Sequence, residues 1–230
     1  MALAPLDATV RAAINAGFLA AGGAPPTADE IATRTCLSRD EVFDSLRRLD
    51  ALGSVTLRPQ TLELWTAPPF SATPTLFRVS CGGSLYWGSC AWSALGICAL
   101  AAAPGEIHAS LGGEGEDVVV QVATDGPRAP MPLYVHFAIP AARWADSLPY
   151  AHSMTLFFRS IDDVDGWSER RRLPRGEAVP IEQAYRLAVA WYGDGATAAG
   201  HMRHRAELEQ LFASVGMDQP HFHLRPRHLW

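Results

Sequence analysis

Residues 85–97 read LYWGSCAWSALGI, and in this run Cys90 stands where an apolar helix is predicted to begin. Ser93 follows one helical turn further along. Unpaired backbone N–H groups and the positive end of the helix dipole favour the thiolate form of a cysteine at such a position. We therefore expect Cys90 to be a functional thiol. The alternative is a small buried hydrophobic residue, which is the commonest role of a free cysteine.

The segment around this helix is apolar, and no charged residue occurs between Arg78 and Glu106. Its length is compatible with a membrane span. However, several glycines and serines interrupt it and Pro104 ends it, which favours a buried helix with its entry loop. The chain is 48% hydrophobic and 19% charged, so a packed core is expected.

The net charge and the cysteine pattern limit the classes of function that the chain can have. The formal net charge of −5 argues against a general nucleic-acid surface or an anionic-membrane surface. The four cysteines show no C-x-x-C spacing, and the N-terminus lacks the basic start of a signal peptide. We expect reduced thiols in a cytoplasmic protein.

The first 70 residues predict a winged-helix-like module. An apolar stripe predicts a helix over 1–22, and two capping boxes, at Thr27 and Ser38, open two more helices. Residues 55–57 and 62–65 then predict a two-stranded wing. The third helix carries three arginines against four acidic residues, which is the wrong balance for contacting phosphates. A structural or dimerising module is therefore favoured over DNA binding.

A second domain is predicted over 76–193. It has strands at 76–80, 106–111, 118–123, 133–139 and 154–159, and helices at 162–172 and 180–192. The remainder, 196–230, predicts an amphipathic helix and a tail that holds His221, His223 and His228. With His201 and His204 these histidines could form a metal site, but a solvated tail is favoured, because no cysteine joins them at ligand spacing.

The segment from Tyr86 to Ile97, the strand from Met154 to Ser160 and the Trp167 helix together resemble the alkylmercury (organomercurial) lyases. The resemblance runs from about Pro26 to Gly193. It implies an α+β fold, in which the winged-helix-like module precedes a small mixed-sheet α/β domain of the organomercurial lyase type. The implied activity is protonolysis of a carbon–mercury bond, with mercury as substrate metal and no required cofactor.

The resemblance also implies a set of catalytic positions. Cys90 matches the family's first mercury-binding cysteine, and soft mercury prefers thiolates. Ser93 stands where the family has a proton-donating carboxyl, and His152 stands near its second cysteine. A hydroxyl is too weak an acid to replace the carboxyl and can at best relay a proton. Cys81 is the better candidate for a second metal-binding thiol beside Cys90, whereas Cys98 is expected in the core.

These matches predict a substrate pocket between the Cys90 helix and strand 154–158. Its expected walls are Tyr86, Trp87, Trp92 and Phe158. The expected ligand is a small molecule, the expected oligomeric state is a monomer or homodimer, and neither nucleic acid nor membrane is expected as a partner.

Two alternative functions remain open from the sequence. In the first, the same scaffold carries altered chemistry, with Cys90 and His152 as a nucleophile–base pair on a non-mercury organic substrate. In the second, the chain is a non-catalytic winged-helix regulator or metal sensor.

Overall fold

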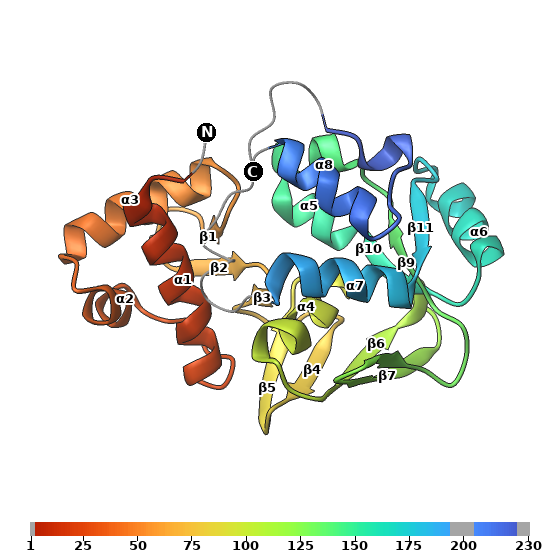
Figure 1. Cartoon of the computed structure of the whole chain (residues 1–230), viewed down its shortest axis with the longest axis horizontal. Coiled ribbons are helices and arrows are strands. Elements are labelled where there is room, and N and C mark those ends of the chain that lie inside the picture. The colour runs from red at the N-terminus through yellow and green to blue at the C-terminus, as the bar shows by residue number, and fades with distance from the viewer. Residues whose placement is uncertain (1–2, 194–204, 225–230) are drawn as a thin grey trace.

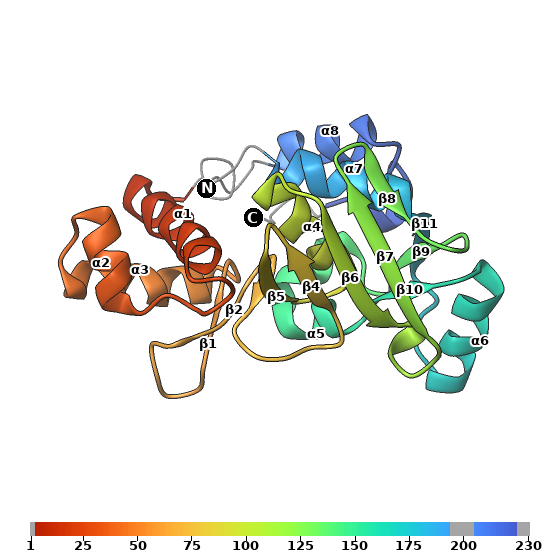
Figure 2. The same cartoon turned by 90° about the horizontal axis from the view of Figure 1, so that it is seen from below.

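A computed structural model describes residues 3–193 and 205–224 of the chain. Its main feature is an eight-stranded antiparallel sheet with the order β1-β2-β3-β5-β4-β6-β7-β8 (Figure 2). The strands are β1 (Thr56–Leu57), β2 (Leu64–Ala67), β3 (Phe70–Ser71), β4 (Arg78–Cys81), β5 (Ser84–Gly88), β6 (Gly105–Ser110), β7 (Asp117–Ala123) and β8 (Gly126–Arg128). Alternating burial along β7 shows that one face of this sheet covers the core.

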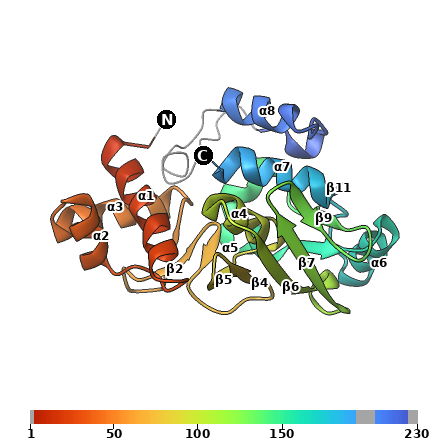
Figure 3. The same ribbon diagram turned by 60° about the horizontal axis from the view of Figure 1, so that its bottom comes forward.

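Helix α4 (Ala91–Ala101) lies on this sheet and is buried along nearly its whole length (Figure 3). Its residues are apolar on every side, which is the pattern of a helix enclosed by other elements. Helix α7 (Ile181–Tyr192) packs against α4, and Gly96 makes the close approach possible. A Cβ atom at Gly96 would lie 2.6 Å from the Tyr192 ring.

A second, three-stranded antiparallel sheet has the order β10-β9-β11. It consists of β9 (Tyr134–Phe137), β10 (Thr155–Phe158) and β11 (Glu177–Pro180). Helix α5 (Leu148–Ser153) leads into β10, and helix α6 (Ile161–Arg171) follows it (Figure 1). Both sheets are antiparallel in every strand pair of the described residues, so the prediction of a mixed sheet was wrong. Many of these strands are joined by short turns, and a short turn can connect only antiparallel neighbours.

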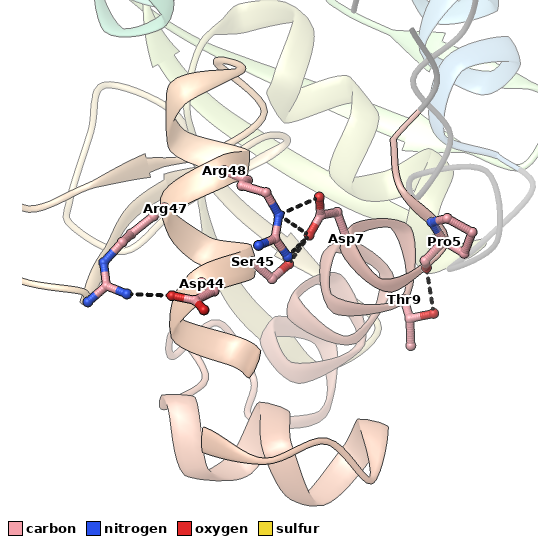
Figure 4. A network of polar contacts seen from close by, with 7 residues as sticks. All are labelled: Pro5, Asp7, Thr9, Asp44, Ser45, Arg47 and Arg48. Atoms are coloured by element: carbon pink, nitrogen blue, oxygen red, sulfur yellow. Dashed lines mark hydrogen bonds and ion pairs between the residues drawn. The ribbon is translucent and has the colours of Figure 1, made fainter. Parts of the chain in front are cut away.

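Helices α1 (Pro5–Ala20), α2 (Ala28–Thr35) and α3 (Arg39–Ala51) form the N-terminal module. Both predicted capping boxes are present, at Thr27 and at Ser38. The Asp7 carboxylate of α1 is buried and accepts hydrogen bonds from Ser45 and Arg48 of α3 (Figure 4). Burial disfavours the charged Asp7, but the hydrogen bonds from Arg48 and Ser45 outweigh it and lower the Asp7 pKa.

All three arginines of α3 form ion pairs with aspartates. Arg39 pairs with Asp29, Arg47 with Asp44, and Arg48 with Asp7. The hairpin of β1 and β2 that follows the helices is hydrogen-bonded through β3 to β5, so the large sheet runs on from the module into the rest of the chain.

Helix α8 (Arg205–Ser214) and a 3-10 turn at Pro220–Phe222 cover the outer side of α7 and the small sheet (Figure 1). Phe222 is fully buried and packs edge-on against Phe137, with ring centroids 5.6 Å apart. The expectation of a solvated tail was therefore wrong for residues 220–224, because their apolar side chains complete the core. His201, His204 and His228 lie outside the described residues.

Within residues 3–193 and 205–224, every helix is too short or too polar to cross a membrane. The apolar segment between Arg78 and Glu106 instead forms β5 and the buried helix α4.

Candidate functional site

The junction of β5 and α4 places Cys90 at the N-cap of α4, as the sequence predicted. Its backbone is extended, and its sulfur accepts a hydrogen bond from the backbone N–H of Ser93 at 3.3 Å. Gly88 allows the helix to start this close to the strand, because a Cβ atom there would lie 2.9 Å from the Ala94 Cα atom.

The Cys90 thiol also contacts the Ser93 side chain. The thiol donates to the Ser93 hydroxyl oxygen, and Cys90 Sγ and Ser93 Oγ lie 3.2 Å apart. Both side chains are buried, at 1% and 0% exposure. The structure therefore brings two of the three predicted catalytic residues together.

The burial of Cys90 opposes the thiolate form that the sequence predicts. Burial raises its pKa to about 11, although hydrogen bonds from Ser93 and Trp92 act in the opposite direction. The cost of removing the thiolate from water exceeds the stabilisation that the helix terminus offers. The raised pKa favours the protonated thiol at neutral pH, and the Ser93 hydroxyl lies within hydrogen-bond distance of the Cys90 sulfur.

His152 belongs to α5, the short helix just before β10. Its Nδ1 atom is fully enclosed and has no hydrogen-bond partner in the described part of the chain. Burial lowers its pKa to about 4, so its imidazole is neutral at pH 7. The Cys90 side chain is hydrogen-bonded within the first turn of α4, and no hydrogen bond joins it to His152.

Cys81 does not join Cys90. The β4–β5 hairpin pairs Cys81 with Ser84 at the start of β5, whereas Cys90 follows Gly88 at its end. Four residues of strand separate these ends by about 13 Å. The Cys81 thiol instead donates to the Ala103 carbonyl at 3.3 Å and interacts with Cys98. The prediction of Cys81 as a second mercury ligand beside Cys90 was therefore wrong.

The four predicted wall residues lie in different packing environments. Tyr86 packs on Phe70, and Trp87 is a half-buried residue of β5. Trp92 packs among Phe137, Trp144, Trp191 and Tyr192. Phe158 contacts the rings of His136 and Trp167. Its neighbour Phe157 points to the other face of β10 and packs against Phe77, just before β4. The described contacts therefore place Trp92 and Phe158 against different aromatic neighbours, and the single pocket with all four walls stays a prediction.

Trp92 is nevertheless close to Cys90 in sequence and carries an unsatisfied group. Its indole N–H is buried without an acceptor in the described residues. A buried donor of this kind is uncommon and costs stability unless a ligand or water receives it. Trp92 and His152 therefore each contribute an unpartnered polar atom to the interior of the described part of the chain.

Sequence reasoning placed Cys98 in the core and missed its neighbour. Cys98 is buried, but it lies against the Cys81 thiol. The helical spacing could have predicted this contact. The eight residues from Cys90 to Cys98 span about 12 Å of helix, which is enough to bring the chain back beside Cys81 at the other end of β5. Among the described residues, no group of three or more His, Cys, Asp and Glu side chains could hold a metal ion.

Comparison with known proteins matches residues 70–193 to the family model of the alkylmercury lyases. This range contains Cys90, Ser93, His152 and both other buried cysteines. A crystal structure of the mercury-bound form of MerB2 has the same fold, with a TM-score of 0.65 and 19% sequence identity. The match covers 83% of this chain and 91% of that one. No curated protein sequence matches the chain.

Proposed function

Because this chain belongs to the alkylmercury lyase family, we propose that its organomercurial lyase-like activity resides at Cys90 and Ser93. The single observation that carries the proposal is the contact between the Cys90 thiol and the Ser93 hydroxyl at the head of α4, inside the matched range. The substrate is an organomercurial, and the products are a hydrocarbon and protein-bound mercury.

Mercury capture requires a soft donor, and Cys90 supplies it. Mercury binds sulfur in preference to oxygen or nitrogen, so the organomercurial docks with its mercury against the Cys90 thiol. The thiol keeps its proton at this stage, and the weaker ligand of the salt leaves as an anion when the sulfur–mercury bond forms. The apolar surroundings of α4 suit the hydrocarbon part of the substrate and exclude competing water.

The proton for the leaving carbon comes from the Cys90 thiol, because its raised pKa keeps that proton in place at neutral pH. As the sulfur–mercury bond forms, the electron pair of the carbon–mercury bond stays with carbon. Carbon takes the Ser93 hydroxyl proton, while the thiol proton moves to the Ser93 oxygen. One S–H bond and one C–Hg bond are thereby exchanged for one S–Hg bond and one C–H bond, and Ser93 ends unchanged.

This scheme gives Ser93 the role of a relay rather than of an acid. A serine hydroxyl does not release a proton to water at neutral pH, but it can pass one on when a donor refills it. The 3.2 Å contact with the Cys90 sulfur is within reach for such a transfer.

The second mercury ligand comes from a thiol in solution. Cys81 lies at the other end of β5 and interacts with Cys98, so the protein offers one sulfur at this site. A small-molecule thiol then completes the two-ligand coordination of the product and removes it.

The alternative nucleophile–base chemistry has less support. A base must lie within hydrogen-bond reach of its nucleophile, and the partner of the Cys90 thiol is Ser93 rather than His152. His152 fits better as a neutral residue lining the interior, with its free Nδ1 atom able to accept a hydrogen bond.

We also assign the N-terminal module, residues 1–70, a winged-helix-like architecture with a structural role. Support comes from its three helices followed by the β1–β2 hairpin. The ion pairs of Arg39, Arg47 and Arg48 with aspartates leave these side chains poorly placed to bind phosphates, which counts against the regulator alternative. In this proposal the protein acts in the cytoplasm as a monomer or homodimer, without nucleic-acid or membrane partners.

The activity is tested by incubating the purified full chain with phenylmercuric acetate and excess cysteine, and measuring benzene and inorganic mercury. We expect both products in equal amounts, with their formation reduced to the protein-free rate in Cys90→Ser. Cys36→Ser is the matched control, because Cys36 is an exposed thiol at the end of α2 and its loss should leave the rate unchanged. Equal rates in wild type and Cys90→Ser would overturn the proposal.

A further inference from the structure

Cys81 and Cys98 form a thiol pair away from Cys90. Cys81 is the last residue of β4 and Cys98 lies in the third turn of α4, and each is 2% exposed. Cys98 Sγ and Cys81 Cβ lie side by side next to Gly105, and the Cys81 thiol donates to the Ala103 carbonyl at 3.3 Å. Both cysteines are in the free thiol form.

Gly105 makes room for this pair. It is paired with Cys81 across β4 and β6, and a Cβ atom there would lie 2.7 Å from Cys98 Sγ and 3.1 Å from Cys81 Cβ. Any other residue would fill the space in front of the two sulfurs. Burial raises the pKa of Tyr185 in α7, and the charges of Cys98 and Cys81 raise it further.

Cys81 is reached from the surface. A depression of about 380 Å³ is lined by Cys81 and by the β4–β5 turn, including Gly82 and Gly83, with Pro104 on its other side. The two glycines of the turn carry no side chains that could block the approach to Cys81.

The two cysteines differ in their access to the surface. Cys81 lines the depression, whereas Cys98 lies behind it in α4 and is not among the lining residues. An incoming cation therefore meets Cys81 first and Cys98 second.

The number of available protein ligands determines which metal ion the pair can hold. Zinc in structural sites needs four ligands, and no third His, Cys, Asp or Glu side chain joins the pair among residues 3–193 and 205–224. Two thiolates alone satisfy a soft ion whose stable complexes are two-coordinate, and Hg²⁺ is the divalent ion of this kind.

We propose that Cys81 and Cys98 bind one Hg²⁺ ion as a two-coordinate bis-thiolate, in a second metal site separate from Cys90. Binding exchanges two S–H bonds for two S–Hg bonds and releases two protons, with no change of oxidation state. The site does not depend on the reaction proposed at Cys90, because Hg²⁺ can be supplied directly as its chloride.

The test uses a Cys36→Ser/Cys90→Ser background, in which the pair is the only source of thiols. The full chain is titrated with HgCl2 in the presence of excess glutathione, and sulfur-to-mercury charge-transfer absorption and retained mercury are measured. We expect one retained Hg²⁺ per chain. Adding Cys81→Ser or Cys98→Ser to this background should weaken retention at least about 10²-fold, because the second sulfur acts at a high effective concentration.

A second measurement does not depend on how these variants fold. Wild-type chain is mixed with one equivalent of HgCl2, alkylated with iodoacetamide under native and then denaturing conditions, and mapped by mass spectrometry. Joint protection of Cys81 and Cys98, relative to mercury-free chain, supports the site. Protection of either cysteine without the other, or retention that is equal in Cys81→Ser, would overturn it.

Discussion

The Cys90 sulfur lies 3.2 Å from the Ser93 hydroxyl oxygen, and both atoms are buried at the N-terminus of α4. The family to which the chain belongs is expected to have a carboxyl group at the position of Ser93. The contact means that this chain keeps a proton path to the sulfur while lacking a group that is acidic by itself. In the reaction that we propose, the proton is therefore drawn from the thiol.

Replacing the hydroxyl tests this relay. Ser93→Asp should raise the rate of benzene release from phenylmercuric acetate about 10²-fold or more, because a carboxyl is a far better proton donor. The first turn of a helix also suits a carboxylate. Ser93→Ala should lower the rate below that of wild type, with near-UV circular dichroism confirming that each variant is folded. A Ser93→Ala rate equal to wild type would remove Ser93 from the mechanism.

The raised pKa of Cys90 predicts its reactivity. With a pKa of about 11, its thiolate fraction rises about tenfold for each pH unit between 7 and 10. The rate of iodoacetamide alkylation at Cys90, followed by peptide mass spectrometry, should rise with the same slope. A rate that levels off below pH 8 would mean that Cys90 is already fully ionised there. That result would contradict the argument that burial raises the Cys90 pKa.

His152 predicts a loss of stability in mild acid. Its pKa is lowered by burial from an ordinary value of 6.5 to about 4, so the unfolded chain binds a proton between these values and the folded chain does not. Stability is therefore full above pH 6.5 and falls as the pH drops towards 4, by on the order of 3 kcal/mol.

Urea unfolding at pH 7 and pH 5 measures this effect. Burial also lowers the pKa of His136. The loss of wild-type stability between the two pH values therefore contains contributions from both histidines. His152→Gln isolates its own share, and we expect the variant to lose less stability than wild type between the two pH values. An unchanged difference would mean that His152 is solvated in the folded protein.

The contact of α4 with α7 predicts a contrast between two helical glycines. Gly96→Ala places a Cβ atom 2.6 Å from the Tyr192 ring and 3.3 Å from Pro69, which should lower the free energy of unfolding by about 1–3 kcal/mol. Gly166→Ala in α6 meets only the flexible end of Arg170 and should be neutral or stabilising by up to about 1 kcal/mol. Urea unfolding of both variants checks the pair, and equal destabilisation would count against close packing at Gly96.

Local signals in the sequence predicted local structure well. The capping boxes at Thr27 and Ser38 located α2 and α3, and the apolar run after Cys90 located α4. These features depend on residues within one or two turns of each other. The same reasoning placed Ser93 one turn from Cys90, where the structure has it.

The features that the sequence did not predict depend on distant parts of the chain. The pairing of Cys81 with Cys98 arises because β5 runs away from the turn and α4 runs back towards it (Figure 2). The pKa of Cys90 depends on burial by elements from the whole domain, which the helix-terminus argument leaves out. The face of β10 on which Phe158 lies could not be predicted, because the orientation of a fully buried strand is not visible in its apolar sequence.

The central claim is that the Cys90 thiol both captures mercury and supplies the proton. It is tested most directly in a single turnover in D2O, with phenylmercury-loaded protein and no added thiol. We predict one monodeuterated benzene for each Cys90, then no further product until a thiol is added, and no benzene from Cys90→Ser. Monodeuterated benzene from Cys90→Ser at the wild-type yield would contradict the account.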